Sequence, residues 1–506
     1  MVPPPRIVDQ IFAIAERDAA RELIVSGADR VTYGLAAQSI RDIAKSLSSS
    51  GLKPGARVAY MGVPAPGFLL SMAATHVADG VWMGLNPRYT AAELAHVISD
   101  AEPSLIVVER EADPQALNKI EEAVAIAGSH AIIQTVDHWR ELTSITAPLS
   151  DTATAPPEGT ALIVYTSGTT GAPKGACLSH IGMVEAARLY AERYRHPELR
   201  SLLNLPINHV GALIDLTSAA IAMEGTLVAM PSFDPATIPA VLAAERISIL
   251  GQVPTMHLMI EAATGYDPTA LSHLKHLVWS GASMPRAFIE RYHNKGVELS
   301  TCYGQTECTG SVTFSPPDAT IDMLADGVGM PAQPGLIRIV SIDGRLVEDG
   351  EAGEILVRGA SLMKGYFNRP EATAAALIDG WLHTGDLGLI GKAGDVRLVG
   401  RLKEMYKSGG YNVYPREIEV ALEEHPAIEA AAVIAMPDPR WDEVGWAFLM
   451  ASSDVSEADL AAYARARLAN YKMPKRMIIR SELPLLPIGK IDKRKLKEAA
   501  SAGAYD

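Results

Sequence analysis

Cysteine is scarce in this chain, and a positive net charge is absent. The three cysteines, Cys177, Cys302 and Cys308, form no CxxC pair, so neither a disulfide framework nor a cysteine zinc motif is expected. The formal net charge of −14 argues against a nucleic-acid partner, which normally binds a basic face. Phosphate ligands stay open, because local lysines and helix N-termini bind anions even in acidic proteins.

A long unbroken apolar run is also missing. The most apolar stretch, Leu202–Met230, is interrupted by Asn204, Pro206, Asn208, His209, Asp215 and Glu224, and a membrane-spanning helix would not tolerate so many breaks. The first residues, Met1–Phe12, lack the basic-then-apolar plan of a signal peptide. We therefore expect a cytoplasmic, soluble protein with no integral membrane segment.

The first part of the chain alternates between helical and strand patterns. Ser39–Leu47 carries an apolar stripe with a helical period, and Thr90–Glu93 is a capping box that opens a second helix. Arg57–Val63 and Ser104–Glu109 each follow or precede such a helix and are typical of buried strands. The alternation predicts an α/β fold of layered sheets and helices, with largely parallel strands.

The composition changes near residue 400, where glycine and charged residues become dense. We place a domain boundary at Leu402/Lys403, which gives a large N-terminal domain (1–402) and a small C-terminal domain (403–506). The small part has a helical pattern from Pro415, an apolar strand over Ala431–Met436 and a further helix ending near Leu468. About a hundred residues can form an α+β domain of their own.

The stretch Thr166–Lys174, TSGTTGAPK, combines glycines, hydroxyls and a lysine. It fails the phosphate loop of NTPases, because Gly175 stands where a Ser or Thr should hold magnesium. A dinucleotide fingerprint occurs once, at Gly327–Ala332, but contains Pro331 and follows no clear strand. Composition alone leaves a phosphate-binding loop and a polar turn as alternatives.

Five segments, which occur in the same order as in a known family, favour the phosphate-binding loop over the polar turn. The chain is similar to the adenylate-forming superfamily, which includes acyl- and aryl-CoA synthetases, peptide-synthetase adenylation domains and beetle luciferases. The segments are Tyr165–Gly175 (YTSGTTGAPKG), Tyr303–Glu307 (YGQTE), Trp381–Gly388 (WLHTGDLG), Gly400–Glu419 (GRLKEMYKSGGYNVYPREIE) and Pro487–Leu496 (PIGKIDKRKL).

The resemblance implies an ATP-dependent carboxylic acid:CoA ligase with ATP, Mg²⁺ and coenzyme A as cofactor and co-substrates. In the first half-reaction the acid attacks the α-phosphorus of ATP, giving an acyl-adenylate and pyrophosphate. In the second, the CoA thiol attacks the acyl carbonyl and AMP leaves. Joining an anion to a polyanion requires charge neutralisation and alignment above all.

The resemblance also assigns the nucleotide ligands. Tyr303 stacks on adenine beside Gly304, Asp386 accepts the ribose hydroxyls with Arg401 nearby, Thr306 lies near the α-phosphate and Glu307 binds Mg²⁺. The adenine is lined by Gly281, Ala282 and Ser283, and Ser280 stands where the family usually has glycine. The β- and γ-phosphates are held by Thr166, Ser167, Gly168, Thr169, Thr170, Gly171 and Lys174.

Lys490 is the expected catalytic lysine, which bridges the substrate carboxylate and the α-phosphate. Lys403 matches the hinge about which the family rotates its small domain between the half-reactions. That rotation would withdraw Lys490 and bring in the segment that admits the pantetheine arm: Lys407, Ser408, Gly409 and Gly410. Tyr406 is bulkier than the apolar residue expected at its position.

The acid-binding pocket is the least legible part. His209 is expected to gate the pocket or orient the carboxylate, and the other lining residues are Val210, Gly211, Trp279, Ser280 and Gly304. Asn208 and His209 stand where amino-acid-activating relatives place an aspartate, which disfavours an α-amino acid. Fatty, aromatic and alicyclic acids all stay open.

Three other functions compete with the CoA ligase. The adenylate could be loaded onto a carrier-protein thiol, the chain could bind nucleotide without catalysis, or Gly327–Ala332 could bind a nicotinamide cofactor. Lys174, Glu307, Asp386, Arg401 and Lys490 are all present, which disfavours an inactive protein. A homodimer is the default expectation for the oligomeric state.

Overall fold

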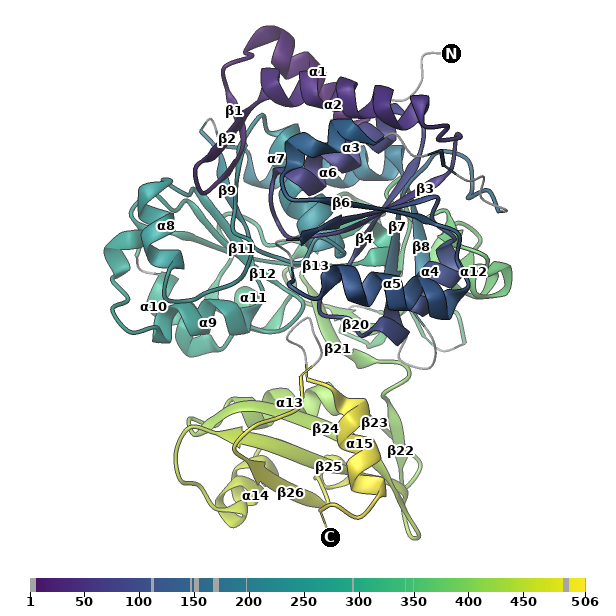
Figure 1. Cartoon of the computed structure of the whole chain (residues 1–506). Coiled ribbons are helices and arrows are strands. Elements are labelled where there is room, and N and C mark those ends of the chain that lie inside the picture. The colour runs from purple at the N-terminus through teal and green to yellow at the C-terminus, as the bar shows by residue number, and fades with distance from the viewer. Residues whose placement is uncertain are drawn as a thin grey trace.

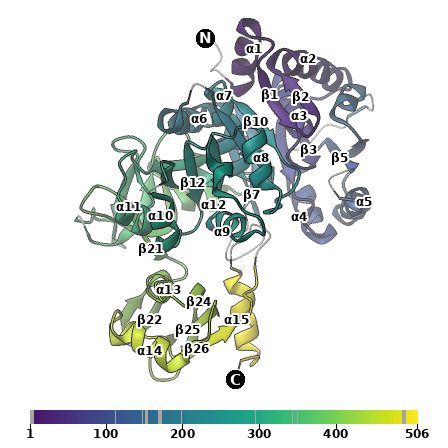
Figure 2. The same ribbon diagram turned by 90° about the vertical axis from the view of Figure 1, so that its left-hand side faces the viewer.

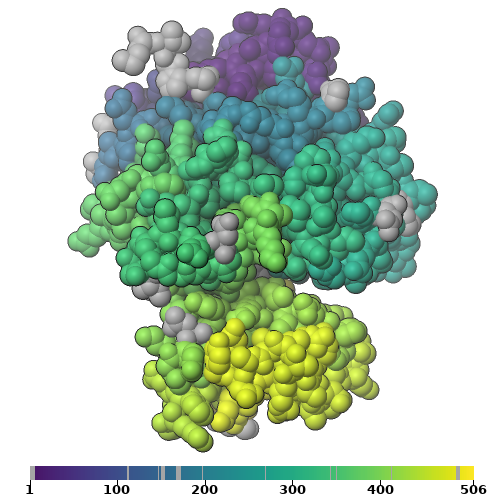
Figure 3. Space-filling model, turned by 180° about the vertical axis from the view of Figure 1, so that it is seen from behind, coloured from purple at the N-terminus to yellow at the C-terminus, as the bar shows by residue number. Residues whose placement is uncertain are grey.

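The computed structural model describes residues 6–110, 113–145, 148–149, 154–166, 173–196, 198–293, 295–341, 343–348, 350–485 and 491–505. The chain forms a large lobe and a smaller one that contains the C-terminus (Figure 1). A view turned by 90° shows the same two lobes (Figure 2), and the surface narrows between them (Figure 3).

The first sheet of the large lobe has seven strands among the described residues, in the order β18-β8-β7-β4-β3-β5-β6. Its centre is parallel, because β3 pairs in parallel with β4 and β5, and β4 with β7. The hairpin of β7 and β8 is antiparallel. The strands are β3 (Arg57–Met61), β4 (Val81–Leu85), β5 (Leu105–Glu109), β6 (Ile132–Val136), β7 (Thr160–Thr166), β8 (Lys174–Ser179) and β18 (Gly365–Tyr366).

The second sheet has nine strands in the part of the chain described, in the order β15-β14-β13-β12-β11-β9-β10-β1-β2. Its strands from β10 to β13 are parallel neighbours, whereas β14 returns antiparallel to β13. The strands are β1 (Glu22–Ser26), β2 (Asp29–Thr32), β9 (Arg200–Leu203), β10 (Thr226–Ala229), β11 (Ile249–Gln252), β12 (His276–Ser280), β13 (Glu298–Gln305), β14 (Gly310–Phe314) and β15 (Met330–Pro331).

Helices cover these sheets and fill the space between them. Helix α3 (Pro66–Val77) is buried on nearly every side, which explains why it lacks a polar stripe. The remaining helices of the large lobe are α1 (Ile7–Arg17), α2 (Tyr33–Ser49), α4 (Ala91–Ala101), α5 (Ala116–Ala127), α6 (His180–Tyr194), α7 (Ala219–Ala222), α8 (Ile238–Ala244), α9 (Pro254–Ala262), α10 (Arg286–His293), α11 (Ile321–Asp326) and α12 (Pro370–Ala376). Short turns of other helix types are η2 (Trp139–Ser144), the π-helix η3 (Gly211–Ser218), η4 (Pro268–Leu271) and η5 (Thr306–Cys308).

A third sheet completes the large lobe and leads to the small one. Its strands are β16 (Ile337–Val340), β17 (Gly353–Val357), β19 (Leu377–Ile378), β20 (Trp381–Ile390) and β21 (Val396–Arg401). The predicted boundary at Leu402/Lys403 falls in the turn after β21. The small lobe contains β22 (Tyr406–Ser408), β23 (Tyr411–Val413), α13 (Pro415–Glu423), β24 (Ile428–Asp438), β25 (Asp442–Ala451), α14 (Glu457–Arg465), η6 (Asn470–Lys472), β26 (Arg476–Arg480) and α15 (Lys493–Ser501).

Several predicted elements are confirmed. The apolar stripe over Ser39–Leu47 lies within α2, and the capping box is formed, because Thr90 accepts from the Glu93 N–H while the Glu93 carboxylate accepts from the Thr90 N–H. The predicted strands at Arg57 and Leu105 are β3 and β5. The layered α/β lobe and the small α+β lobe match the expected fold class. Within the described part of the chain, no helix combines the length and apolar character needed to cross a membrane.

The stretch Gly327–Ala332 is not a strand–turn–helix unit. Gly327 ends helix α11, and Met330–Pro331 then forms the short strand β15. A dinucleotide fingerprint needs a strand before the glycines and a helix after them, so this segment has the wrong order of elements.

Candidate active site

The β7–β8 hairpin presents the two described ends of the predicted phosphate loop. Thr166 lies opposite Lys174 in the register, and the Thr166 hydroxyl donates to the Lys174 carbonyl at 3.5 Å. The Lys174 ammonium lies 5.1 Å from the centroid of the Tyr366 ring, within the range of a cation–π contact. The remaining predicted loop residues, Ser167, Gly168, Thr169, Thr170 and Gly171, lie outside the described residues.

Tyr366 connects this hairpin to Glu307. Strand β18, which carries Tyr366, pairs with β8, and the phenol donates to Glu307 Oε1 at 2.8 Å. Burial, and then the charge of Glu307, raises the pKa of Tyr366, so the phenol keeps its proton and acts as the donor. The Met363 N–H also donates to the Glu307 carbonyl, at 2.9 Å. Glu307 is thus held from both its main chain and its side chain.

Sequence reasoning missed Tyr366. Its only signal was an aromatic residue in the segment GYFNRP (365–370). Tyr366 lies 59 residues beyond Glu307, and the segment gives no sign of the contact. The pairing of β18 with β8 is a long-range feature, and a single sequence does not encode it in any local pattern.

Tyr303, Asp386 and Arg401 form a continuous line. The Tyr303 phenol donates to Asp386 Oδ2 at 2.8 Å, and Arg401 Nε lies 3.0 Å from Asp386 Oδ1. Burial, and then the carboxylate of Asp386, raises the pKa of Tyr303 well above its usual range. Asp386 and Arg401 face each other in the β20–β21 register, which explains their contact. The residues predicted to bind base and ribose therefore touch one another.

The segment predicted to line the adenine lies beside Tyr303. Ser280 ends β12 directly opposite Cys302 of β13, and it is followed by three exposed residues, Gly281, Ala282 and Ser283. Thr306 opens the short turn η5 and is half-buried. These positions agree with a shared ligand surface along the ends of β12 and β13.

Position 304 has no room for a side chain larger than that of glycine. A Cβ atom at this position would lie 1.9 Å from the Gly310 carbonyl oxygen of the neighbouring strand. The register of β13 and β14 shifts between Tyr303 and Gly304, so the two strands approach closely at this bulge. Gly304 itself is exposed, which keeps the surface next to Tyr303 open.

Only some of the residues predicted to line the acid pocket are accessible in the structure. His209, Val210 and Gly211 are half-buried at the start of η3. Trp279, in contrast, is 1% exposed and packs with Leu277 and Phe288 in an apolar core cluster. Because side chains alternate along β12, Trp279 points to the face opposite Val278, so the expectation that it lines an open pocket is corrected.

Asp215 is a second residue that sequence reasoning did not single out. It lies in η3 and accepts from the Ser311 N–H at 3.1 Å and from the Ser311 hydroxyl at 2.9 Å. Burial raises the pKa of Asp215 from its ordinary value of 3.8 to about 6. The available signal was a lone carboxylate inside an otherwise apolar helical stretch.

The small lobe carries the predicted hinge and CoA residues. Lys403 is exposed in the turn after β21, and Lys407 and Ser408 lie in β22. Gly409 and Gly410 form the turn to β23 with φ angles of +57° and +86°, a region that favours glycine. The predicted catalytic lysine, Lys490, lies outside the described residues.

Tyr406 fits its position despite its size. It is 2% exposed and packs in the core of the small lobe with Val413 and Ile418. The aromatic ring therefore serves as a core residue, and the departure from the expected apolar side chain is accommodated by packing.

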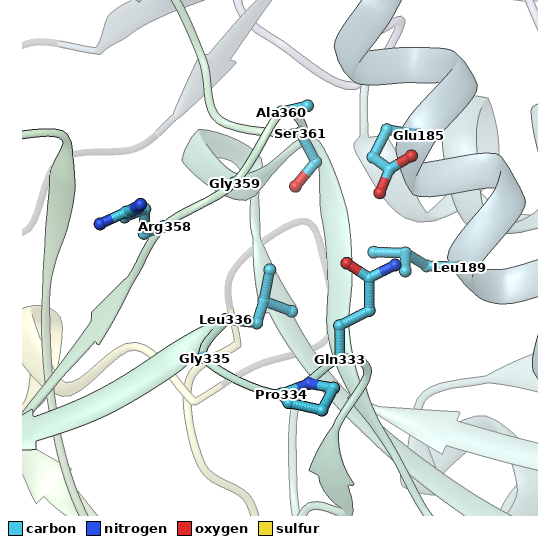
Figure 4. A pocket seen from close by; sticks show the side chains of 10 residues that line it. All are labelled: Glu185, Leu189, Gln333, Pro334, Gly335, Leu336, Arg358, Gly359, Ala360 and Ser361. Carbon is cyan, nitrogen blue, oxygen red and sulfur yellow. The ribbon is translucent and has the colours of Figure 1, made fainter.

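A separate pocket of about 100 Å³ lies between α6 and the loops around residues 333–336 and 358–361 (Figure 4). Its lining residues are Glu185, Leu189, Gln333, Pro334, Gly335, Leu336, Arg358, Gly359, Ala360 and Ser361. None of these is a predicted ligand residue, so this pocket is distinct from the site described above.

Comparison with known proteins identifies the family. The sequence model of the family described as "AMP-binding enzyme" matches residues 11–367, and that of "AMP-binding enzyme C-terminal domain" matches residues 417–490. Feruloyl-CoA synthase of Amycolatopsis sp is 33% identical over 93% of this chain and 94% of its own length. Long-chain-fatty-acid–CoA ligase FadD13 of Mycobacterium tuberculosis is 33% identical over 94% of each chain. The crystal structure of ATP-bound MatB from Rhodopseudomonas palustris is 28% identical, covers 98% of each chain and superposes with a TM-score of 0.87. The chain therefore belongs to the AMP-binding enzymes.

Proposed function

We propose that this protein is an ATP-dependent carboxylic acid:CoA ligase, which forms an acyl-adenylate and pyrophosphate and then an acyl-CoA and AMP. Membership of the AMP-binding enzymes, together with relatives named as CoA synthase and CoA ligase, supports the reaction class. The observation that carries the proposal is the line from Tyr303 through Asp386 to Arg401, because it joins the expected base and ribose ligands.

The residues proposed to bind the adenosine part of ATP already lie in position in this structure. Asp386 holds a fixed carboxylate, bonded on one oxygen by Tyr303 and approached on the other by Arg401. A carboxylate of this kind can accept hydrogen bonds from the two ribose hydroxyls, while the exposed Gly281–Ser283 segment leaves room for the base. We assign Tyr303, Asp386 and Arg401 to adenosine binding on this basis.

The phosphate end has a cation and a carboxylate held by one tyrosine. Lys174 lies over the ring of Tyr366, and Tyr366 donates to Glu307. Mg²⁺ favours one or two carboxylates together with phosphate oxygens, so Glu307 fits as its protein ligand beside a triphosphate. Bound there, Mg²⁺ would neutralise phosphate charge.

Lys174 and Lys490 would have different roles in the reaction. Lys174, at the start of β8, would help to hold the departing pyrophosphate, and Thr306 would lie near the α-phosphate. Lys490 would approach the substrate carboxylate and the α-phosphate and stabilise the charge that gathers there. The exposed Lys403 would serve as the hinge, and Gly409 and Gly410 would give the pantetheine arm close passage along the backbone.

The test combines an acid panel with one variant. Fatty, aromatic and alicyclic acids would be supplied with ATP, Mg²⁺ and CoA, while pyrophosphate, AMP and acyl-CoA are measured separately. We expect AMP and acyl-CoA to appear in equal amounts for the accepted acids. Acyl-AMP that accumulates in the presence of CoA would instead favour loading of a carrier-protein thiol.

Lys490→Ala separates the two half-reactions. The variant should lose adenylate formation by several orders of magnitude yet still convert supplied acyl-AMP and CoA to acyl-CoA. Lys497→Ala is a suitable control, because Lys497 is exposed on α15. Equal loss of both half-reactions in Lys490→Ala would contradict the assigned role. The homodimer and the cytoplasmic location stay predictions, to be checked by light scattering and cell fractionation.

A further inference from the structure

The π-helix η3 has one accessible face. Gly211 and Asp215 are half-buried, whereas the residues between them and the three that follow, Leu216–Ser218, are buried. In a π-helix, whose hydrogen bonds run from i to i+5, residues four apart lie about one turn from each other. His209 and Val210 are half-buried as well. A stripe of accessible surface therefore runs along the segment from His209 to Asp215.

The far end of this stripe contacts strand β14, which pairs with the strand that carries Tyr303 and Gly304. Asp215 bonds to Ser311, and Ser311 lies opposite Gly304 in the β13–β14 register. Asp215 also lies against Gly310, since a Cβ atom there would come within 2.6 Å of Asp215 Oδ1. The carboxylate thus lies at the end of the accessible stripe that begins at His209, next to the residue that pairs with Gly304. His209 and Gly304 were both predicted to line the acid pocket.

The hydrogen-bonding capacity of Asp215 is only half used. An ionised carboxylate can accept about four hydrogen bonds, and Ser311 supplies two. Among the described residues, no lysine, arginine or histidine forms an ion pair with Asp215. A carboxylate that is partly shielded from water and has no counter-charge costs stability, so its presence needs an explanation other than packing.

We propose that Asp215 accepts a hydrogen bond from a donor group, a hydroxyl or an ammonium, that the acid substrate carries away from its reacting carboxyl group. The inference rests on the proposed ligase function and names its substrate class: carboxylic acids with a polar far end. A plain hydrocarbon chain in the same place would exclude water from Asp215 without replacing the lost hydrogen bonds. Sites built to bond a substrate hydroxyl reject the analogue that lacks it for this reason.

Matched pairs of acids test the proposal on the wild-type enzyme. Each pair has one carbon skeleton, with and without the donor: hexanoate and octanoate with their ω-hydroxy and ω-amino forms, and phenylpropanoate and cinnamate with their para-hydroxy forms. The readout is kcat/KM for CoA-dependent AMP release. We expect the donor-bearing acid to be preferred at least ~10-fold at the skeleton length that reaches Asp215.

Two substitutions distinguish the hydroxyl from the ammonium. Asp215→Ala should remove the preference in both cases and raise kcat/KM for the plain acid. Asp215→Asn keeps an acceptor oxygen but loses the charge, so a hydroxyl acid should retain most of its advantage and an amino acid should lose it. Thr217→Val is the matched control, because Thr217 is fully buried on the same helix and should not alter the preference. Thermal melting of each variant verifies that it is folded.

The outcomes separate this inference from the ligase function. Turnover of several acids with no preference for donors, unchanged by Asp215→Ala, would overturn the inference and leave the ligase function in place. If no acid released AMP with CoA, the ligase function would be refuted and the inference would fall with it.

Discussion

Tyr366 is the residue whose hydroxyl does most to connect the candidate site. It touches Lys174 through its ring and Glu307 through its oxygen. Lys174 begins strand β8 and Glu307 lies in the turn η5, so the two residues come from segments far apart in the sequence. A single hydroxyl therefore fixes the direction of the carboxylate assigned to Mg²⁺. Because Tyr366 reaches the phosphates only through other groups, it is a positioning residue.

Tyr366→Phe tests that role. The ring, and so the contact with Lys174, is kept, while the hydrogen bond to Glu307 is lost. Hydrogen bonds to charged groups contribute about 1.5–3 kcal/mol, which corresponds to roughly a 10- to 160-fold loss in adenylation. The concentration of Mg²⁺ needed for half-maximal rate should rise as well. An unchanged Mg²⁺ dependence, with a merely lower melting temperature, would show that the hydroxyl only supports packing.

Asp215 makes stability depend on pH. Its pKa is raised in the folded state, from 3.8 to about 6, so the folded protein binds this proton more tightly than the unfolded chain. The stabilisation from that proton is fully present below about pH 4 and is lost as the pH rises through 6. At pH 8, Asp215→Asn should therefore be more stable than the wild type by on the order of 3 kcal/mol. Chemical denaturation at pH 4 and pH 8 measures this, and an equal difference at both values would contradict the argument.

Functional residues could be predicted from the sequence where they lie in a short recognisable motif, and not where a contact with a distant segment positions them. Asp386 and Arg401 lie in recognisable segments, and the structure places them in contact. Trp279 was assigned to the pocket from its neighbourhood in the sequence, but strand alternation turns it into the core. Tyr366 and Asp215 owe their positions to contacts with residues 59 and 96 positions away in the sequence, which no local pattern reveals.

At the scale of elements, the β13–β14 bulge brings strands of the second sheet unusually close. Gly304 lies against the Gly310 carbonyl there, and Gly310 has a φ of +123°. The bulge places Tyr303 on the nucleotide side and Ser311 on the side of Asp215. One irregularity in a sheet therefore serves both the predicted nucleotide site and the predicted acid pocket.

Gly304→Ala should be destabilising out of proportion to its size. The added methyl group would overlap a backbone oxygen that cannot move without breaking the strand pairing, at a cost of about 3 kcal/mol. Gly211→Ala is the matched control for stability, because its Cβ atom would meet only Leu205, at 3.6 Å. Urea denaturation of both variants checks this. Equal stability of the two would show that the strands can separate at the bulge.

Helices whose caps and apolar stripes lie within one short segment could be predicted from the sequence. The pairing of strands from distant segments could not. The capping box at Thr90 fixed the start of α4, and the apolar stripe fixed the face of α2. The order of strands in the sheets, and the pairing of β18 with β8, depend on contacts between distant segments. The π-helix also had no distinctive sequence, since its residues read as an ordinary apolar helix.

At the scale of the whole molecule, the two lobes are joined by a short exposed turn after β21. Lys403 lies in this turn, only two residues beyond Arg401. The small lobe has its own apolar core, which contains Tyr406, Ile418 and Leu460, so it can move as a unit.

Lys403→Pro tests the hinge. Proline fixes φ near −65° and should restrict rotation about this position, so the CoA step should slow more than adenylation, by about 10-fold or more. Lys403→Ala removes the side chain but leaves the backbone free, and it should affect the two steps alike. Single-turnover rates of acyl-AMP formation and consumption separate them. Normal rates for both steps in the proline variant would place the hinge elsewhere.

The line from Tyr303 to Arg401 ends just before this turn, and that has a consequence for the intermediate. A rotation that begins at Lys403 would turn the small lobe and leave Tyr303, Asp386 and Arg401 where they are. The acyl-adenylate, a mixed anhydride that water readily destroys, would then stay anchored by its sugar throughout the cycle. The small lobe would exchange Lys490 for the CoA-binding segment while the acyl-adenylate stays in place. The labile acyl-phosphate bond would therefore not have to move between two sites.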